Sequence, residues 1–318
     1  MESGKIDGLA FIGGSNAADR LIKYHPHPHR LKIFLQLEGK NMAILHNSLF
    51  EDDSSQNDES YNLDKALDEI ITGALSFNGQ RCTALKIIFA PKGRGEIVAN
   101  ELSKRVQRLR IGLPWQTFND EYAQITPLPT SDRISVMNSF IEDALSKGSS
   151  IINPNGGTTV TQVDKFSNVS TSNLMVPSVL FPMKPDMELY REEQFGPIIP
   201  VAEYNAETFE EILSFAHEGK YGQQVSIFTR TSNDEISFLV DQFSAVFGKI
   251  NLNSQCGRSP DILPFSARKS SGLGVMSVED ALREFSVPTV VAYKTGNDLN
   301  IRSTVQEVQV KSNFMTSL

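Results

Sequence analysis

The 318-residue chain has few cysteines and no long apolar run. Its two cysteines, Cys82 and Cys256, are far apart in the sequence, so they provide no disulfide framework and are typical of a reducing compartment. No apolar run reaches the ~18 residues of a transmembrane helix, and the N-terminus lacks the basic and apolar segments of a secretory signal. These absences predict a cytoplasmic protein without a membrane partner.

Clustered positive charge is also missing. The chain has 30 lysines and arginines against 38 aspartates and glutamates, which gives a net charge of -8. Nucleic-acid binding depends on clustered basic side chains that neutralise phosphates, so we expect no nucleic-acid partner. Hydrophobic residues make up 40% of the chain, which is enough at this length for a substantial core in two lobes.

What the sequence does contain is a regular alternation of helices and strands. Such alternation predicts an α/β fold built on a sheet. The predicted strands cover residues 8–12, 32–37, 42–45, 85–90, 149–152, 174–181, 224–229, 247–252 and 287–293, and the predicted helices cover residues 17–23, 63–75, 94–109, 131–147, 207–218, 233–245 and 278–285. The polar segment 51–62 is expected to be a solvated loop. The last strand lacks a partner and is available to the sheet edge of a neighbouring subunit.

Cys82 follows the helical pattern of residues 63–75 and precedes the apolar run 85–90. A thiolate is the reactive form of cysteine and is favoured beside cationic side chains, so Arg81 is a suitable activator of a nucleophile. An isolated cysteine is, however, more often a small buried apolar residue. Local chemistry alone leaves both interpretations open.

A second feature is the turn Gly13-Gly14-Ser15, between a predicted strand and a predicted helix. Backbone N–H groups at a helix N-terminus bind phosphate, although many such turns use glycine for steric reasons only. The histidines of segment 25–30 alternate with prolines, which favours an extended surface connector, and we predict no metal site.

Three motifs, in order along the chain, resemble the aldehyde dehydrogenase superfamily. They are the diphosphate turn at 11–15 (FIGGS), the cysteine signature at 79–83 (GQRCT) and the Glu-Glu-x-Phe-Gly-Pro motif at 192–197 (EEQFGP). Within the superfamily, segments 80–86 and 258–265 most resemble the NADP-dependent non-phosphorylating glyceraldehyde-3-phosphate dehydrogenase branch.

The resemblance, which covers roughly residues 11–294, implies an aldehyde dehydrogenase-like α/β catalytic domain. Residues 1–39 would be the remnant of a truncated Rossmann-type dinucleotide-binding domain, because the N-terminal third of the family is missing from this sequence. Residues 40–276 would form the catalytic domain, and 277–318 a C-terminal helix, an oligomerisation strand and a tail. The family pattern also implies a homo-oligomer, either a dimer or a tetramer.

The implied reaction is oxidation of a small aldehyde, phosphorylated or not, with hydride transfer to NADP or NAD. Cys82 would be the nucleophile that forms a thioester. Glu193 would bind the nicotinamide ribose and Phe195 would flank the nicotinamide. Arg81 and Arg258 would contact the substrate, Arg258 through a phosphate.

The turn residues Gly13, Gly14 and Ser15 would bind the cofactor diphosphate. At the position of the family's general base this chain has Gln36, which cannot take a proton from water, and general-base help is worth ~10²–10⁴-fold. Glu38 is the candidate replacement, although a two-residue offset displaces it by about 7 Å along the strand. Thioester transfer to another nucleophile, such as coenzyme A, is a further alternative.

Three functions are therefore compared. The first is an aldehyde-oxidising enzyme that uses Cys82, with turnover impaired in this short form. The second is a pseudoenzyme that associates with full-length aldehyde dehydrogenase subunits. The third is a thiol esterase that acts without a nucleotide. Arg81, Cys82, Glu193 and Phe195 favour retained chemistry, whereas Gln36 and the missing third favour the pseudoenzyme.

Overall fold

The fold is built on a seven-stranded sheet. The computed structural model describes residues 1–51, 61–163, 170–294 and 299–313. In spatial order the strands are β14 (Lys249–Leu252), β13 (Gln224–Phe228), β3 (Asn41–Leu45), β4 (Leu85–Pro91), β11 (Ile198–Tyr204), β10 (Ser178–Phe181) and β7 (Ser150–Ile151). All neighbouring pairs are parallel except β10 with β7, which is the pattern of an α/β sheet with an antiparallel edge strand.

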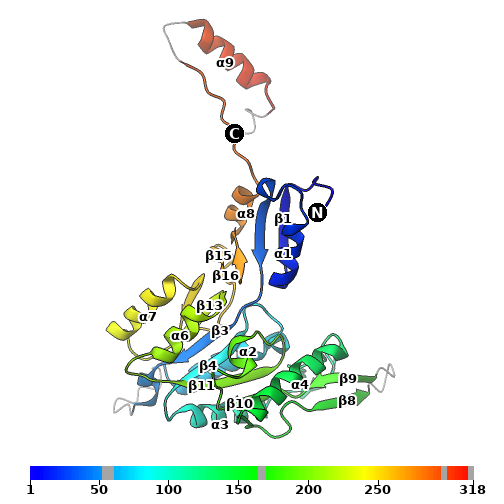
Figure 1. The fold of residues 1–318 in the computed structure, drawn as a ribbon, viewed down its shortest axis with the longest axis vertical. Coiled ribbons are helices and arrows are strands. Elements are labelled where there is room, and N and C mark those ends of the chain that lie inside the picture. Colours follow the sequence, from blue (N-terminus) through cyan, green and yellow to red (C-terminus); the bar gives the residue numbers. More distant parts are fainter. Residues whose placement is uncertain (52–60, 164–169, 295–298, 314–318) are drawn as a thin grey trace. The chain divides into compact units, whose positions relative to one another are not determined.

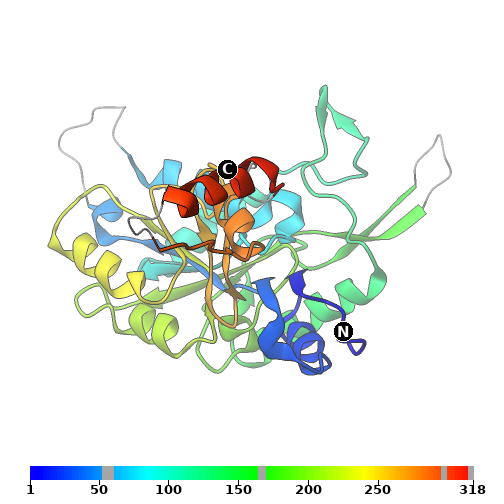
Figure 2. The same cartoon turned by 90° about the horizontal axis from the view of Figure 1, so that it is seen from above.

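Helices cover both faces of this sheet (Figure 2). Because side chains alternate along a strand, β3 directs Met42 and Ile44 into one core and Ala43 and Leu45 into the other. The first core is closed by α4 (Ser131–Ser146), α5 (Glu188–Arg191), α6 (Glu210–Glu218) and α7 (Asp234–Ser244), and the second by α2 (Leu63–Leu75) and α3 (Gly95–Val106).

A second, three-stranded sheet holds the N-terminal part of the chain (Figure 1). It consists of β1 (Gly8–Ile12), β2 (Lys32–Gln36) and β17 (Gly272–Leu273), with β1 parallel and β17 antiparallel to β2. Helix α1 (Ser15–Lys23) packs on it through a small apolar cluster that includes Ala18 and Leu35. The four residues 37–40 join β2 directly to β3, so they link the two sheets.

The remaining strands of the described residues form four antiparallel pairs. They are β5 (Thr117–Phe118) with β6 (Glu121–Tyr122), β8 (Thr159–Val163) with β9 (Ser170–Met175), β12 (Tyr221–Gly222) with β16 (Arg268–Lys269), and β15 (Phe265–Ser266) with β18 (Val275–Met276). The other helical elements are the 3-10 turns η1 (Pro28–Arg30), η2 (Asn47–Phe50) and η3 (Ser76–Gly79) and the helices α8 (Val278–Glu284) and α9 (Leu299–Lys311).

Most elements expected from the sequence are confirmed, and several differ. Strand β11 was not predicted, although it lies in the middle of the large sheet. The single strand expected at 174–181 is two strands, because Val176 and Pro177 separate β9 from β10. Helix α9 lies in the segment that was expected only to be a tail. Most of the expected solvated loop, residues 52–60, lies outside the described residues.

The chain divides into two units, Met1–Glu284 and Phe285–Leu318. In the second unit, the expected strand at 287–293 has neither helix nor strand structure. A strand is defined by ladder hydrogen bonds to a partner, so the oligomerisation strand stays a prediction, as do the domain limits at residues 39 and 276. Among the described residues, no helix is long and apolar enough to cross a membrane.

Candidate active site

Cys82 lies in the short loop between η3 and β4, and its side chain is partly exposed. The last three residues of η3, 77–79, all have positive φ, between 54° and 68°. A Cβ atom on Gly79 would lie 2.6 Å from the carbonyl oxygen of Gly196, so the close approach requires glycine here. This tight reversal after α2 places Cys82 at the start of a central strand.

Two side chains from the junction between the sheets hold the Cys82 loop. The Nε2 of Gln36, the last residue of β2, donates to the Cys82 Sγ over 2.8 Å. The Nδ2 of Asn41 donates to the carbonyl oxygens of Cys82 and Ala84 over 2.7 and 2.9 Å. The structure therefore brings Gln36 and Cys82 together. The Gln36 carboxamide orients the sulfur but has no group that takes a proton at neutral pH.

Lys86, on β4, is a buried cation next to this loop. Its side chain is 1% exposed, and Nζ donates to the carbonyl oxygens of Gly79 and Gln194, each over 2.8 Å. Nζ also lies 3.9 Å from Glu193 Oε1 and 4.8 Å from the centre of the Phe195 ring. Burial lowers the pKa of Lys86 to about 8, against the opposing effect of the Glu193 charge.

Glu193 is the carboxylate partner in this buried cluster. Its Oε1 accepts from the backbone N–H of Gly39 over 3.1 Å. Burial raises the pKa of Glu193, and the nearby charge of Lys86 opposes that shift. A Cβ on Gly39 would lie 3.1 Å from the carbonyl oxygen of Cys82, so Gly39 contacts the carboxylate on one side and the cysteine loop on the other. Glu193, Phe195 and Cys82 thus belong to one site.

A second buried lysine, Lys40, extends the cluster. Its Nζ donates to Oε1 of Gln194, whose Nε2 donates to the carbonyl oxygens of Lys86 and Ile198. Burial, together with the charge of Lys86, lowers the pKa of Lys40 well below its ordinary value. Gln194 therefore links the 192–197 motif to both lysines.

Glu38 turns away from the cysteine. Its Oε2 accepts from the backbone N–H of Ser15 over 2.8 Å, at the N-terminus of α1. A Cβ on Gly14 would lie 3.1 Å from Glu38 Oε1, so the carboxylate lies directly against the glycine turn. The residue at the position of the base and its candidate replacement therefore have different partners. Gln36 contacts Cys82, and Glu38 contacts the turn predicted to bind phosphate.

The two arginine candidates lie on different loops. Arg81 donates from Nη1 to Ser76 Oγ over 3.1 Å and lies 5.4 Å from the centre of the exposed Phe77 ring. Arg258, which is half exposed, lies 3.6 Å from Asp261 and 5.9 Å from the centre of the Phe265 ring. Arg81 is adjacent to Cys82, whereas Arg258 interacts within its own loop and with the first residue of β15.

The loop of Arg258 is still within electrostatic range of Arg81. Burial raises the pKa of Cys256 to about 12, and the charges of Lys249 and Arg81 act against that shift. Cys256 precedes Arg258 by two residues, so the guanidinium of Arg81 is close enough to influence this loop. The positive charge of Arg81 thus acts on Cys256.

The histidine-rich segment has a structural role in this fold. His25 is buried, with Nε2 against the carbonyl oxygen of Ile6 and Nδ1 accepting from the N–H of His27. Within the described ranges, no group of three or more histidine, cysteine, aspartate or glutamate side chains is arranged to hold a metal ion.

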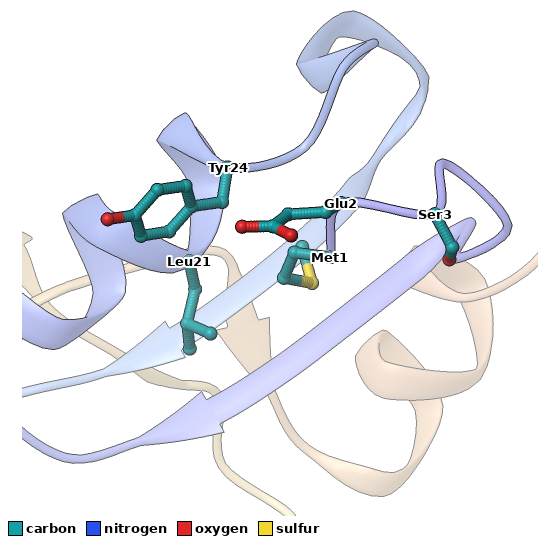
Figure 3. A pocket seen from close by; sticks show the side chains of 5 residues that line it. All are labelled: Met1, Glu2, Ser3, Leu21 and Tyr24. Carbon is teal, nitrogen blue, oxygen red and sulfur yellow. The ribbon is translucent and has the colours of Figure 1, made fainter.

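A surface depression of about 360 Å³ lies at the other end of the small sheet (Figure 3). It is lined by Met1, Glu2, Ser3, Leu21 and Tyr24. These residues precede β1 or end α1, whereas Gln36 and Cys82 meet at the carboxyl end of β2. The depression is thus separate from the cysteine site.

Sequence reasoning missed Lys40, Asn41, Lys86 and Gln194 as members of the site. One signal was available for Lys86, because a lysine inside an otherwise apolar strand must find a buried partner. The other three have no local pattern that separates them from ordinary polar residues.

Comparison with known proteins agrees with this fold. Residues 1–291 match the model of the aldehyde dehydrogenase family. The chain belongs to that family. Among curated relatives, NADP-dependent glyceraldehyde-3-phosphate dehydrogenase of Apium graveolens is 30% identical over 277 residues, which are 87% of this chain and 48% of the relative. The protein of the same description from Streptococcus equinus is 30% identical over 247 residues, 78% of this chain and 44% of the relative.

Solved structures show the same similarity. The NADP complex of NADP-dependent glyceraldehyde-3-phosphate dehydrogenase from Bacillus halodurans has a TM-score of 0.72 and 27% identity, and the match covers 89% of this chain and 52% of that one. Lactaldehyde dehydrogenase from Escherichia coli shares the fold, with a TM-score of 0.73 at 21% identity over 89% of this chain and 53% of that one. This chain spans about half the length of the curated relatives it matches.

Proposed function

We propose that the chain carries the catalytic part of an NADP-linked aldehyde oxidation in which Cys82 is the nucleophile. The observation that supports this most is a cluster of contacts around Cys82. Gln36 donates to the Cys82 sulfur. Glu193 accepts from the N–H of Gly39, and Lys86 donates to the carbonyl oxygen of Gly79. The family fold adds support, because this cluster occurs on it together with the 192–197 motif.

In the proposed first step, the Cys82 thiolate forms a carbon–sulfur bond with the aldehyde carbon. The carbonyl π-electrons move to oxygen, which then takes a proton to give a thiohemiacetal. The backbone N–H of Cys82 is a candidate donor to that oxygen.

Oxidation of the thiohemiacetal to a thioester requires a hydride acceptor, which is the chemistry that a bound nicotinamide dinucleotide supplies. Glu193 and Phe195 fit the nicotinamide end, because a carboxylate and an aromatic ring lie together beside the cysteine loop. The phosphate end fits less well, since Glu38 already contacts the turn Gly14–Ser15.

Hydrolysis of the thioester is expected to be the slow step. Water must lose a proton as it attacks the acyl carbon, and Gln36, which contacts the sulfur, cannot accept it. Glu38 is held on Ser15 instead. We therefore propose that the acylated Cys82 accumulates during turnover, or that its acyl group passes to a stronger nucleophile than water.

For the substrate we propose a small aldehyde that carries a phosphate. Support comes from Arg81, which precedes Cys82 and is partly exposed, and from the exposed Arg258. A guanidinium can bind phosphate oxygens through two parallel hydrogen bonds. The relatives named above are described as glyceraldehyde-3-phosphate dehydrogenases, which makes this aldehyde the first to test.

The deciding experiment follows NADPH formation from glyceraldehyde 3-phosphate and NADP+ with the purified chain. Cys82→Ser is expected to lower the rate by on the order of 10³-fold or more, whereas the matched control Cys256→Ser keeps the wild-type rate. Equal loss in both variants, or no NADPH formation by the wild-type chain, would count against the proposal.

A second candidate function is a pseudoenzyme that associates with full-length aldehyde dehydrogenase subunits. It is favoured by Gln36 in place of a base and by the exposed apolar side chains of Val287, Val290 and Val291. Sedimentation of the chain, alone and with a full-length NADP-dependent glyceraldehyde-3-phosphate dehydrogenase, tests for dimers, tetramers and mixed assemblies. If sedimentation shows a monomer under both conditions, the candidate fails, as does the proposed homo-oligomer.

A further inference from the structure

The contact between Glu38 and the start of α1 has no role in the chemistry proposed for Cys82. Glu38 lies 23 residues from Ser15 in the sequence, yet its carboxylate accepts the backbone N–H of Ser15. Gly14, the residue before the helix, has no side chain to cap it, and the first turn of α1 has no acidic residue of its own. Glu38 therefore supplies, from another segment, the negative charge that this helix end attracts.

The same N–H group is the one that a phosphate would use. The N-terminus of a helix attracts anions because its first N–H groups have no partner within the helix and its dipole is positive there. Glu38 Oε1 lies 3.1 Å from the position of a Cβ on Gly14, so the carboxylate occupies the space directly over the turn. A phosphate oxygen and this carboxylate cannot both accept from Ser15 without strong repulsion between the two anions.

The backbone that carries Glu38 is held on both sides. Gln36 contacts the Cys82 sulfur and the N–H of Gly39 contacts Glu193. A Cβ on Gly39 would meet the Cys82 carbonyl oxygen at 3.1 Å, so the segment also packs closely against the cysteine loop. Removing the carboxylate from Ser15 must therefore occur by side-chain rotation, with little help from the backbone.

We propose that the Glu38 carboxylate is an internal competitor for the diphosphate of a dinucleotide at the turn Gly14–Ser15. The affinity of the chain for nucleotide is then set by the displacement of Glu38. This inference rests on the proposed function for the assignment of the turn to the cofactor. It makes Glu38 a determinant of cofactor affinity and not a replacement for the base at Gln36.

The test measures binding of inorganic pyrophosphate and of NADP+ by calorimetry at low ionic strength, where screening is weak. Glu38→Gln removes the charge and keeps the size of the side chain, and Glu38→Gly also opens the space over the turn. Both variants are expected to bind each ligand at least about tenfold more tightly than the wild type, because one like charge is removed from the site.

Glu203→Gln is a matched control. Glu203 Oε1 accepts from the N–H groups of Gly93 and Gly95 at the start of α3, so it also places a carboxylate at a helix N-terminus. This variant is expected to bind both ligands like the wild type, because the start of α3 is covered: a Cβ on Gly95 would clash with the ring of Phe181. Thermal unfolding followed by circular dichroism checks that every variant is folded, and Glu38→Gln serves if Glu38→Gly is not.

A local readout identifies where the ligand binds. Titration of Glu38→Gln with pyrophosphate is expected to shift the backbone amide resonance of Ser15 in a nitrogen–proton correlation spectrum. Equal affinity of the wild type and both Glu38 variants, including no binding by any of them, overturns the inference. An equal gain in Glu203→Gln also overturns it, because the effect would then be one of net charge.

The experiments distinguish failure of this inference from failure of the proposed function. If the wild type oxidises aldehyde through Cys82 and the Glu38 variants bind no more tightly, the inference fails and the function stands. If pyrophosphate binding tightens as expected but no variant forms NADPH, the inference about the turn stands and the oxidoreductase function fails.

Discussion

The two cysteines differ in burial and in the elements that surround them. Cys256 follows β14 and is 1% exposed, with Ser226 Oγ at 3.2 Å from its sulfur and Asn251 as a second polar neighbour. Burial raises its pKa to about 12. Cys82 precedes β4, is partly exposed and receives a hydrogen bond from Gln36. The comparison shows that one cysteine is buried in the core and that the other is accessible at the surface.

The most severe test of this comparison is alkylation. At about pH 8 a thiol with a pKa of about 12 is only ~10⁻⁴ ionised, so Cys82 is expected to react with iodoacetamide at least ~10³-fold faster than Cys256. The rate at Cys256 should rise about tenfold per pH unit until the pH approaches its pKa. Mass spectrometry of the peptides measures both rates, and urea-unfolded protein, in which the two should react alike, is the control. Similar alkylation rates at the two cysteines of the folded chain would contradict the difference in accessibility between Cys82 and Cys256.

The next largest effect concerns the contact between Gln36 and the Cys82 sulfur. Gln36→Glu places a carboxylate at the sulfur and is expected to raise steady-state NADPH formation by up to ~10²-fold, because general-base help in hydrolysis becomes available. The measurement compares the first turnover with later ones, and the mass of the acylated chain reports accumulation. Gln36→Met, which is similar in length but has no polar group, should give no gain. An increase in both variants would show that hydrolysis does not limit the rate.

A smaller effect comes from Lys86, the buried cation on the Cys82 side. Its pKa is about 8 in the folded chain and near the ordinary value of 10.5 when unfolded, so between these values the unfolded chain binds more protons. Stability must then increase with pH in this window. From about pH 8 to pH 9.5 the free energy of unfolding of the wild type is expected to rise by on the order of 1.5 kcal/mol relative to Lys86→Met.

Urea unfolding at several pH values provides this measurement. Lys220→Met is the control, because Lys220 is half exposed and pairs with Glu192 at the surface. The difference in the free energy of unfolding between the wild type and Lys220→Met should show no comparable change with pH. If the difference in the free energy of unfolding between the wild type and Lys86→Met does not change over this pH range, Lys86 keeps its charge when the chain is folded.

The smallest effect concerns Arg258, which lies in the same loop as Cys256 and is proposed to bind the substrate phosphate. Arg258→Ala is expected to raise the KM for glyceraldehyde 3-phosphate about fivefold to tenfold, since one charged hydrogen-bonding group is lost. Propanal, which has no phosphate, is the control substrate and should show an unchanged KM. If both aldehydes are affected equally, the loop contributes to folding and not to phosphate recognition.

Local patterns predicted the elements that depend on local physics. Helix α2 begins and ends where apolar spacing placed it, because six of its residues are buried on one side of a period of 3.6 residues. Strand β11 was missed, although it is seven residues long and pairs with two neighbours. Its Pro200 lacks an N–H, which argues against a central strand, and here the pairing at Leu180 tolerates it.

The sequence by itself determined the family, the cysteine at position 82 and the motif that carries Glu193 and Phe195, because these are ordered runs of adjacent residues. Only the tertiary structure decided that Glu38 binds Ser15 and that Lys86 lies beside Glu193. The physical reason is range. The periods of helices and strands relate residues a few positions apart, whereas these contacts join separate segments across two sheets, where packing and burial fix which charged groups meet.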